Sequence, residues 1–171
     1  LLHKVGIRDH QAIFNSYPYQ LPEGVCQKIM IAMAIAKKPK LLIADEPTTA
    51  LESTTQAQLF RLLASFNQLK GMSILLISHE LETVARNTQT LSVLYCGQLV
   101  EAGETATILK QPLHPYTDAL IKSVSEFQPD LASKQPLYAL PGSIPTLQHL
   151  PIGCRLGPRC PNARKECVKT P

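Results

Sequence analysis

Short apolar runs alternate with longer stretches of helical periodicity through the first two thirds of the chain. Residues 41–44 form a continuous apolar run that ends at two carboxylates, which is typical of a strand buried on both faces of a parallel sheet. Residues 73–77 predict a second strand. Residues 23–37 and 54–68 have the spacing of helices. Because strands and helices alternate, the sequence predicts an α/β fold.

Each of the two longer helices has its apolar residues at helical spacing. In the first helix these residues are Ile29, Met33 and Ala36. In the second they are Leu59, Leu62, Leu63 and Phe66. A short helix is predicted over 80–87, and residues 91–95 and 99–101 predict a hairpin around Gly97.

The composition of the chain changes near residue 125. Seven prolines interrupt the sequence between residues 129 and 161, which makes regular structure unfavourable there. We therefore divide the chain into an α/β part, residues 1–125, and a Pro-rich, cysteine-containing and irregular extension, residues 126–171.

Two acids follow the first predicted strand, at the end where open α/β sheets bind ligands. Adjacent carboxylates at a buried edge are costly unless a positive group meets them, and a nucleotide-bound Mg²⁺ ion would do so. Asp45 is the candidate for holding Mg²⁺ through water, and Glu46 is the candidate general base that polarises the attacking water. The alternative is that both acids only cap the segment that follows.

These residues resemble the Walker B strand of ATP-binding cassette (ABC) ATPases. His79 resembles the switch histidine of that family, which contacts the γ-phosphate and braces the general base, although a single histidine at a strand end is more often structural. The segment 49–52, ending in Glu52, resembles the D-loop, in which aspartate is usual at the last position. The resemblance implies the C-terminal part of a P-loop ABC ATPase domain, with a parallel sheet flanked by helices and with ATP and Mg²⁺ as cofactors.

Residues 21–24 occupy the place of the Leu-Ser-Gly-Gly signature of this family but depart from it. Leu21 and Gly24 remain, while Pro22 has neither a hydroxyl nor a backbone N–H, and Glu23 replaces a glycine. A carboxylate about 5 Å from a phosphate costs roughly 3 kcal/mol per unit charge at an effective dielectric of about 20. The sequence therefore predicts a degenerate half-site opposite a partner ATPase, unless the flexibility of the loop tolerates the exchange.

The segment 113–117, Leu-His-Pro-Tyr-Thr, and the cysteines after it resemble the tail of oligopeptide- and dipeptide-transporter ATPases. Within that group the chain looks most like the ATPases of peptide-uptake systems linked to antimicrobial-peptide sensitivity. Cys154, Cys160 and Cys167 are spaced C-x5-C-x6-C. The resemblance favours a [4Fe–4S] cluster on them, and zinc or no metal are the alternatives, because thiolates suit either metal and a fourth ligand is missing.

The phosphate-binding motif Gly-x-x-x-x-Gly-Lys-Ser/Thr does not occur in the 171 residues. We therefore expect that this chain is a fragment or the product of a truncated reading frame, and that alone it binds ATP poorly. A net charge of +4 without a basic block does not suggest nucleic-acid binding, and no apolar run reaches the length of a membrane span.

The expected function is that of the ATP-hydrolysing subunit of a bacterial peptide importer on the cytoplasmic face of the inner membrane. Expected partners are a second ABC ATPase, the membrane permease subunits and, indirectly, a periplasmic peptide-binding protein. One alternative is a non-catalytic remnant without the phosphate loop. Another is a soluble ABC protein of translation or DNA repair, although the long charged linkers of those proteins are not visible here.

Overall fold

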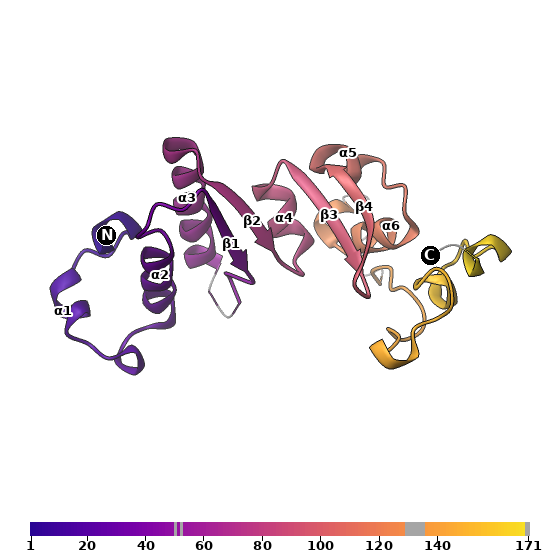
Figure 1. Ribbon diagram of the computed structural model, residues 1–171, viewed down its shortest axis with the longest axis horizontal. Helices are drawn as coiled ribbons and strands as arrows, with labels where there is room; N and C mark the ends of the chain where they lie inside the picture. Colours follow the sequence, from indigo (N-terminus) through magenta and orange to yellow (C-terminus); the bar gives the residue numbers. More distant parts are fainter. Residues whose placement is uncertain (50, 52, 129–135, 170–171) are drawn as a thin grey trace. The chain divides into compact units, whose positions relative to one another are not determined.

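The computed structural model describes residues 1–49, 51, 53–128 and 136–169, which form parts of two compact units (Figure 1). The first unit is Leu1–His79 and the second is Glu80–Pro171. Helices alternate with strands and one strand pair is parallel, so the predicted α/β class is confirmed. The second unit contains residues on both sides of position 125, and the division predicted there stays a prediction.

A strand–helix–strand crossover forms the centre of the first unit. The strands β1 and β2 pair in parallel, with partners running from Leu41 and Ser73 to Asp45 and Ile77. Parallel neighbours need a crossover of a dozen or more residues, and the helix α3 provides it. The elements of this unit are η1 (Leu2–Val5), α1 (His10–Phe14), η2 (Pro18–Gln20), α2 (Glu23–Ala34), β1 (Leu41–Asp45), α3 (Ser53–Lys70) and β2 (Ser73–Ile77).

The hydrophobic core of the first unit includes side chains of α2, α3 and β1. On α3, three of the four residues predicted to share one face are buried, and Leu62 is half-buried. Ala32 of α2 and its C-cap residue Ile35 are buried, whereas Met33 is 71% exposed. The residues that pack into the core, Ala32 and Ile35, are therefore neighbours in sequence of the predicted Met33 and Ala36.

The prediction that the first strand is buried on both faces is wrong for the described residues. Along β1 the side chains alternate, with Leu42 and Ala44 buried and Leu41 and Ile43 more than half exposed. Alternation of this kind is expected where only one face of a strand is packed. The buried face of β1 contributes Leu42 to the core of the first unit, which also contains residues of α3.

The helix α2 ends three residues earlier than its apolar spacing predicts. Ile35 is its C-cap residue, and Lys38 then has a φ of +53°. Since Pro39 follows, Lys38 is disfavoured in the α-helical region and the helix cannot continue through it. The chain therefore leaves α2 through a tight turn and enters β1.

A two-residue hairpin is the central feature of the second unit. Tyr95 pairs with Gln98, and the turn residues Cys96 and Gly97 both have positive φ values, +47° and +78°. A two-residue turn with positive φ at both residues matches the right-handed twist of the two strands that it joins. The elements are α4 (Leu81–Asn87), β3 (Thr90–Tyr95), β4 (Gln98–Glu104), α5 (Thr105–Lys110), α6 (Pro115–Lys122), and the 3₁₀ turns η3 (Ser125–Phe127), η4 (Leu147–His149), η5 (Gly157–Arg159) and η6 (Lys165–Val168).

The segment before α6 is fixed by one carboxylate and one imidazole. Glu101 accepts hydrogen bonds from the backbone N–H groups of Leu113, at 2.8 Å, and His114, at 3.1 Å. His114 Nδ1 accepts from the N–H of Tyr116 and caps the helix. Burial lowers the pKa of His114 more than the charge of Glu101 raises it. The ring is therefore neutral at pH 7, as this acceptor role requires.

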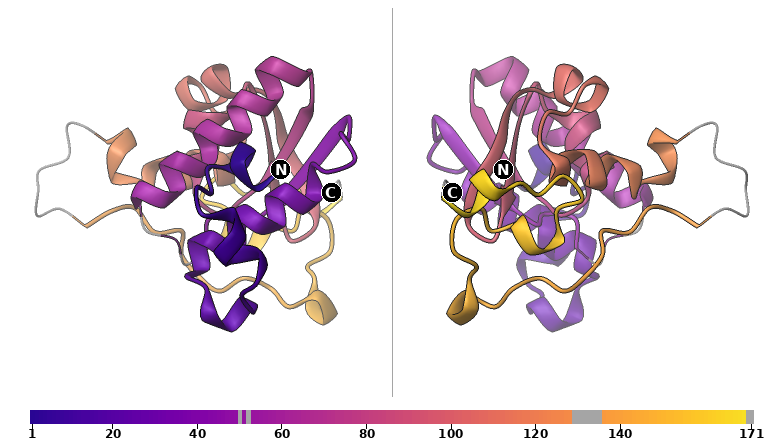
Figure 2. Two further views of the ribbon diagram at one scale, coloured as in Figure 1. Left: turned by 90° about the vertical axis from the view of Figure 1, so that its left-hand side faces the viewer. Right: turned by 90° about the vertical axis from the view of Figure 1, so that its right-hand side faces the viewer.

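Two arginines connect the extension to the β3–β4 hairpin within the second unit. Arg155 donates to the carbonyl of Cys96, and Arg159 donates to the hydroxyl of Tyr95 at 3.2 Å. The ring of Tyr95 also packs against Tyr116, with the ring centroids 4.7 Å apart. Figure 2 shows the described part of the extension, in orange to yellow, as an irregular trace with short helical turns.

We predict that Leu59→Ala lowers the free energy of unfolding by about 2–5 kcal/mol, because Leu59 is almost fully buried on α3 and its truncation leaves a cavity. The control is Leu41→Ala, which truncates a half-exposed leucine and should cost about 0.5 kcal/mol or less. Urea unfolding followed by circular dichroism measures both. Equal losses in the two variants would contradict this assignment of the core.

Candidate functional site

The carboxyl ends of β1 and β2 meet at one edge of the two-stranded sheet. Asp45, the last residue of β1, is in register with Ile77, the last residue of β2. The backbone N–H of Glu46 donates to the carbonyl of Ile77 at 2.9 Å and extends the pairing by one residue. The structure therefore brings the two predicted acids to the edge at which open parallel sheets bind ligands. Carboxylate oxygens are ligands that suit Mg²⁺, so the exposed Asp45 fits the predicted role.

The side chains of Glu46 and His79 are in direct contact. Glu46 Oε1 lies 2.8 Å from His79 Nδ1 and accepts a second hydrogen bond, at 2.9 Å, from the backbone N–H of His79. Since an ionised carboxylate only accepts, Nδ1 carries the proton of this contact. The side chain of His79 is 76% exposed and that of Glu46 is 35% exposed. A ligand in solvent can therefore reach both groups.

The contact with His79 changes the acidity of Glu46. The hydrogen bond from the His79 ring lowers the pKa of Glu46, and partial burial opposes this effect without cancelling it. The backbone N–H and the charge of His79, together with the hydroxyl of Thr49, lower the pKa further. Glu46 is therefore ionised at neutral pH, which a general base must be.

The backbone of Glu46 has a conformation that residues other than glycine rarely adopt. Its φ is +44°, in the left-handed region. Pro47 follows, and a proline normally holds the residue before it in an extended conformation. Local strain of this kind costs on the order of 1–3 kcal/mol and persists only where surrounding contacts enforce it. The turn after β1 is therefore held in place by its neighbours.

Two glutamine side chains bind carbonyl groups of the loop that follows Glu46. Gln27 on α2 donates from Nε2 to the carbonyl of Pro47. Gln56 on α3 donates to the carbonyls of Thr48, at 3.4 Å, and Leu51, at 3.2 Å. Thr48 itself is buried. The loop is thus connected both to the helix that precedes β1 and to the helix that follows it.

These two glutamines could hardly be identified from the sequence. Gln27 lies beside the signature segment, but its partner is twenty residues away and only the fold brings it close. Gln56 lies in α3, for which the sequence predicted only the apolar face. The predicted D-loop residue Glu52 lies outside the described residues.

The predicted signature segment, residues 21–24, leads directly into α2. Pro22 is the N-cap residue and its side chain makes no capping hydrogen bond. Glu23 is the first residue of the helix, where its negative charge offsets the positive end of the helix dipole. Gly24 has little free space, because a Cβ at this position would lie 3.0 Å from Cγ2 of Thr55. Glu23 therefore places a carboxylate at the N-terminal end of α2. A helix end that binds phosphate would carry no such negative charge.

The three tail cysteines do not form a metal-binding group. The N–H of Cys154 donates to the carbonyl of Cys167 at 2.8 Å, and both residues line a hollow of about 170 Å³. Cys160 does not line it. In the described part of the chain, no group of three or more His, Cys, Asp or Glu side chains is placed to hold a metal ion. As arranged, the cysteines do not fit a [4Fe–4S] cluster, and the structure gives that prediction no support.

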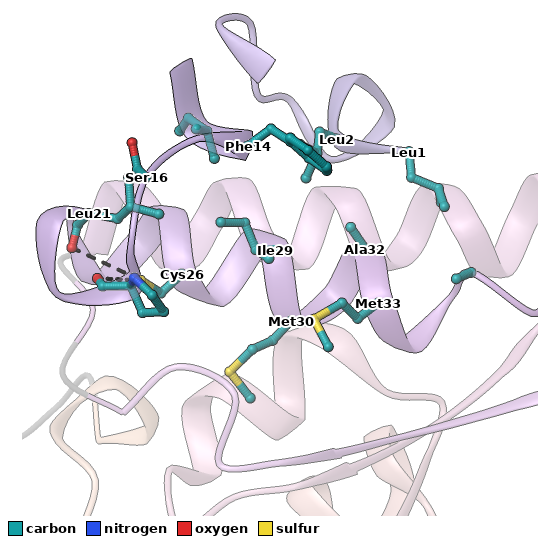
Figure 3. Close-up of a pocket in the computed structure, with 13 residues that line it drawn as sticks. Leu1, Leu2, Phe14, Ser16, Leu21, Cys26, Ile29, Met30, Ala32 and Met33 are labelled. Atoms are coloured by element: carbon teal, nitrogen blue, oxygen red, sulfur yellow. Dashed lines mark hydrogen bonds between the residues drawn. The ribbon is translucent and has the colours of Figure 1, made fainter. Parts of the chain in front are cut away.

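An apolar groove of about 580 Å³ lies along α2 in the first unit (Figure 3). Its lining includes Phe14, Ile29 and Met33, and the thiol of Cys26 in its wall donates to the carbonyl of Pro18 at 3.5 Å. Its lining side chains include no carboxylate or imidazole group. The candidate catalytic residues Glu46 and His79 lie outside it.

Two family models match separate parts of the chain. The model described as ABC transporter matches residues 1–49. The model described as the C-terminal region of oligopeptide/dipeptide transporters matches residues 100–167. In the described residues, none of the helices has the length and apolar character that crossing a membrane requires.

Curated relatives match over nearly the whole chain. The peptide transport system ATP-binding protein SapD of Escherichia coli O6:H1 is 54% identical over 100% of this chain and 52% of its own length. SapD of Haemophilus influenzae is 54% identical over 100% of this chain and 49% of its own length. The dipeptide transport ATP-binding protein DppD of E. coli K12 is 48% identical over 98% of this chain and 50% of its own length. The chain spans about half the length of these relatives.

Solved structures share the fold. A dimeric structure of MJ0796, a bacterial ABC transporter cassette, has a TM-score of 0.54 and 29% identity, and the match covers 61% of this chain and 44% of that chain. A post-hydrolysis state of the same cassette, bound to ADP and Pi, has a TM-score of 0.53 and 27% identity over the same shares.

The strand edge and these matches together define part of an ATP-binding cassette. The chain belongs to the ABC transporter family, in its oligopeptide/dipeptide group.

We predict that the Glu46 carboxyl titrates below the ordinary glutamate range and that His79→Ala raises its midpoint. Folding lowers this pKa, so the contact stabilises the fold above the unfolded pKa and is lost as the pH falls through the folded value. Carbon-13 NMR of glutamate-labelled chain measures the midpoint, with Glu46→Gln assigning the signal. His149→Ala, which removes a histidine of the second unit, is the control. An unchanged midpoint in His79→Ala would contradict the proposed contact.

Proposed function

We propose that this chain supplies the general base and the signature helix of an ATP-hydrolysing subunit in a bacterial peptide importer. The observation that carries the proposal is the hydrogen-bonded pair of Glu46 and His79 at the shared carboxyl edge of β1 and β2. Membership of the oligopeptide/dipeptide group supports the assignment to transport. The proposal concerns the working transporter, since the chain spans about half the length of its curated relatives.

Each polar residue at the strand edge has a separate proposed role. Asp45 holds Mg²⁺ through water, since its carboxylate ends β1 beside the candidate base. Glu46 orients the attacking water and accepts its proton. The substrate MgATP would supply the γ-phosphoryl group that this water takes, with ADP as the leaving group. His79 holds the Glu46 carboxylate in one orientation with two hydrogen bonds. Phosphoryl transfer depends mainly on such positioning and on electrostatic stabilisation. Glu46 can therefore act by orienting the water even though its lowered pKa makes it a weak base.

The signature segment is proposed to form a degenerate half of the site of a partner ATPase. Pro22 cannot donate a hydrogen bond to a phosphate, and Glu23 repels one. The start of α2 and Gly24 still present backbone N–H groups. Two copies of this subunit would form two impaired sites. A heterodimer would have only one, because a different ATPase subunit supplies the other signature segment.

The proposed surroundings follow from the same family. The subunit would dock on membrane permease subunits at the cytoplasmic face of the inner membrane, and a periplasmic binding protein would deliver the peptide from the other side. The relatives SapD and DppD are described as a peptide and a dipeptide transport protein, which supports peptide as the class of cargo.

We predict that Glu46→Gln lowers ATP hydrolysis by the assembled transporter by about 10²–10⁴-fold while ATP still binds, because an amide cannot accept the proton of water. ATPase assays and equilibrium binding of ATP separate the two effects. Glu104→Gln is the matched control, since it removes a carboxylate in the second unit that accepts from Thr107. Hydrolysis at the original rate in Glu46→Gln would refute the proposed base.

We predict that the double change Pro22→Ser and Glu23→Gly raises the ATPase rate of the complex with both ATPase subunits present, because it restores a hydroxyl and removes a negative charge beside the phosphate. The single change Glu23→Gln isolates the electrostatic effect. A rate that stays the same in the double variant would rule out a degenerate half-site.

A further inference from the structure

The side chain of Gln27 joins the helix that carries the signature segment to the turn that carries the candidate base. Gln27 lies four residues into α2 and is partly buried. Its Nε2 donates to the carbonyl of Pro47, the residue directly after Glu46. The contact spans twenty residues of sequence, so it depends on the packing of α2 beside the end of β1.

The conformation of Glu46 is fixed on both sides. On the N-terminal side, the backbone N–H of Glu46 donates to the carbonyl of Ile77 in the sheet at 2.9 Å. After it, Gln27 holds the carbonyl of Pro47. Between these two fixed points Glu46 keeps its left-handed φ of +44°. A residue before proline otherwise favours an extended backbone, so the contacts around the turn oppose this relaxation. Besides these two contacts, the N–H of Thr49 donates to the carbonyl of Glu46 at 3.3 Å.

Relaxation of this turn would move the carboxylate. A change from a left-handed to an extended backbone reorients the side chain of Glu46 relative to β1. The carboxylate would then lose the two hydrogen bonds that it now accepts from His79. The second glutamine, Gln56, holds only carbonyls farther along the loop, those of Thr48 and Leu51. It therefore restrains the loop without acting on the peptide next to Glu46.

We infer that Gln27 is a positioning residue that keeps Glu46 aimed at His79 and couples the position of the signature helix to the position of the base. This inference rests on the proposed role of Glu46 as the general base. A movement of α2 that breaks the bond between Gln27 and Pro47 releases the turn and weakens catalysis. The start of α2, at Glu23, is thereby connected to the catalytic edge of the same subunit through one side-chain amide.

The test replaces Gln27 by methionine, which has a similar length and volume but no N–H donor. In Gln27→Met we expect the titration midpoint of Glu46 to move up towards the ordinary glutamate range, as in His79→Ala. In the assembled transporter we expect kcat to fall by roughly 10- to 100-fold with KM changed by less than about twofold, because a misplaced base affects the transition state and not the binding of ATP.

Two further variants make the result specific. Gln27→Lys keeps a donor on a side chain of comparable length and should restore most of kcat and the lowered midpoint. Gln58→Ala removes another contact of α2 with α3, the hydrogen bond of 3.3 Å from Lys28 Nζ, and should change neither the midpoint nor kcat.

An unchanged Glu46 midpoint and unchanged kcat in Gln27→Met would overturn the positioning role. Equal changes in Gln27→Met and Gln58→Ala would also overturn it, because they would reflect a general loosening of α2. The proposed function fails separately, if Glu46→Gln retains full hydrolysis. In that event the NMR midpoint in Gln27→Met still decides whether Gln27 positions the carboxylate.

Discussion

The parallel pairing of β1 with β2 is the constraint on which the candidate site depends. The in-register pairing of Asp45 with Ile77 places the residues after both strands at one edge, where Glu46 and His79 meet. A slip of one residue would turn every side chain of a strand to the opposite face. Leu42 of β1 shares one hydrophobic cluster with the core residues of α3, led by Leu59, and a slip would remove Leu42 from that cluster. Stability in the core is therefore a requirement for chemistry at the edge.

The turn after β1 shows how the molecule maintains an unfavourable local conformation at a functional position. Glu46 adopts a left-handed backbone before a proline, which the local sequence opposes. Sheet pairing with Ile77 and the side chains of Gln27 and Gln56 surround the turn and bind its backbone groups. The contact with His79 then selects one orientation of the carboxylate and lowers its pKa.

Much of the fold could be predicted from periodicity. The spacing of Leu59, Leu63 and Phe66 predicted the buried face of α3, and Gly97 marked the hairpin turn. Apolar content alone misled in β1, because a run of apolar residues does not tell whether one face or two are covered, and Ile43 is exposed. Within the site, Glu46 and His79 could be recognised because Glu46 directly follows β1 and His79 is separated from the end of β2 by one residue. The cysteines could not be placed from spacing, because an irregular segment has no fixed geometry to relate them.

The sequence by itself determined which elements form and which polar groups end the two strands, because helical spacing, apolar runs and the Glu-Pro pair are local properties. It also determined the family, through the order of its motifs. Only the tertiary structure decided that Glu46 contacts His79, that its backbone is left-handed, and that Gln27 reaches Pro47. These contacts join residues 20 to 33 positions apart. Their geometry depends on how helix and sheet pack, and local preferences at Glu46 favour a different backbone.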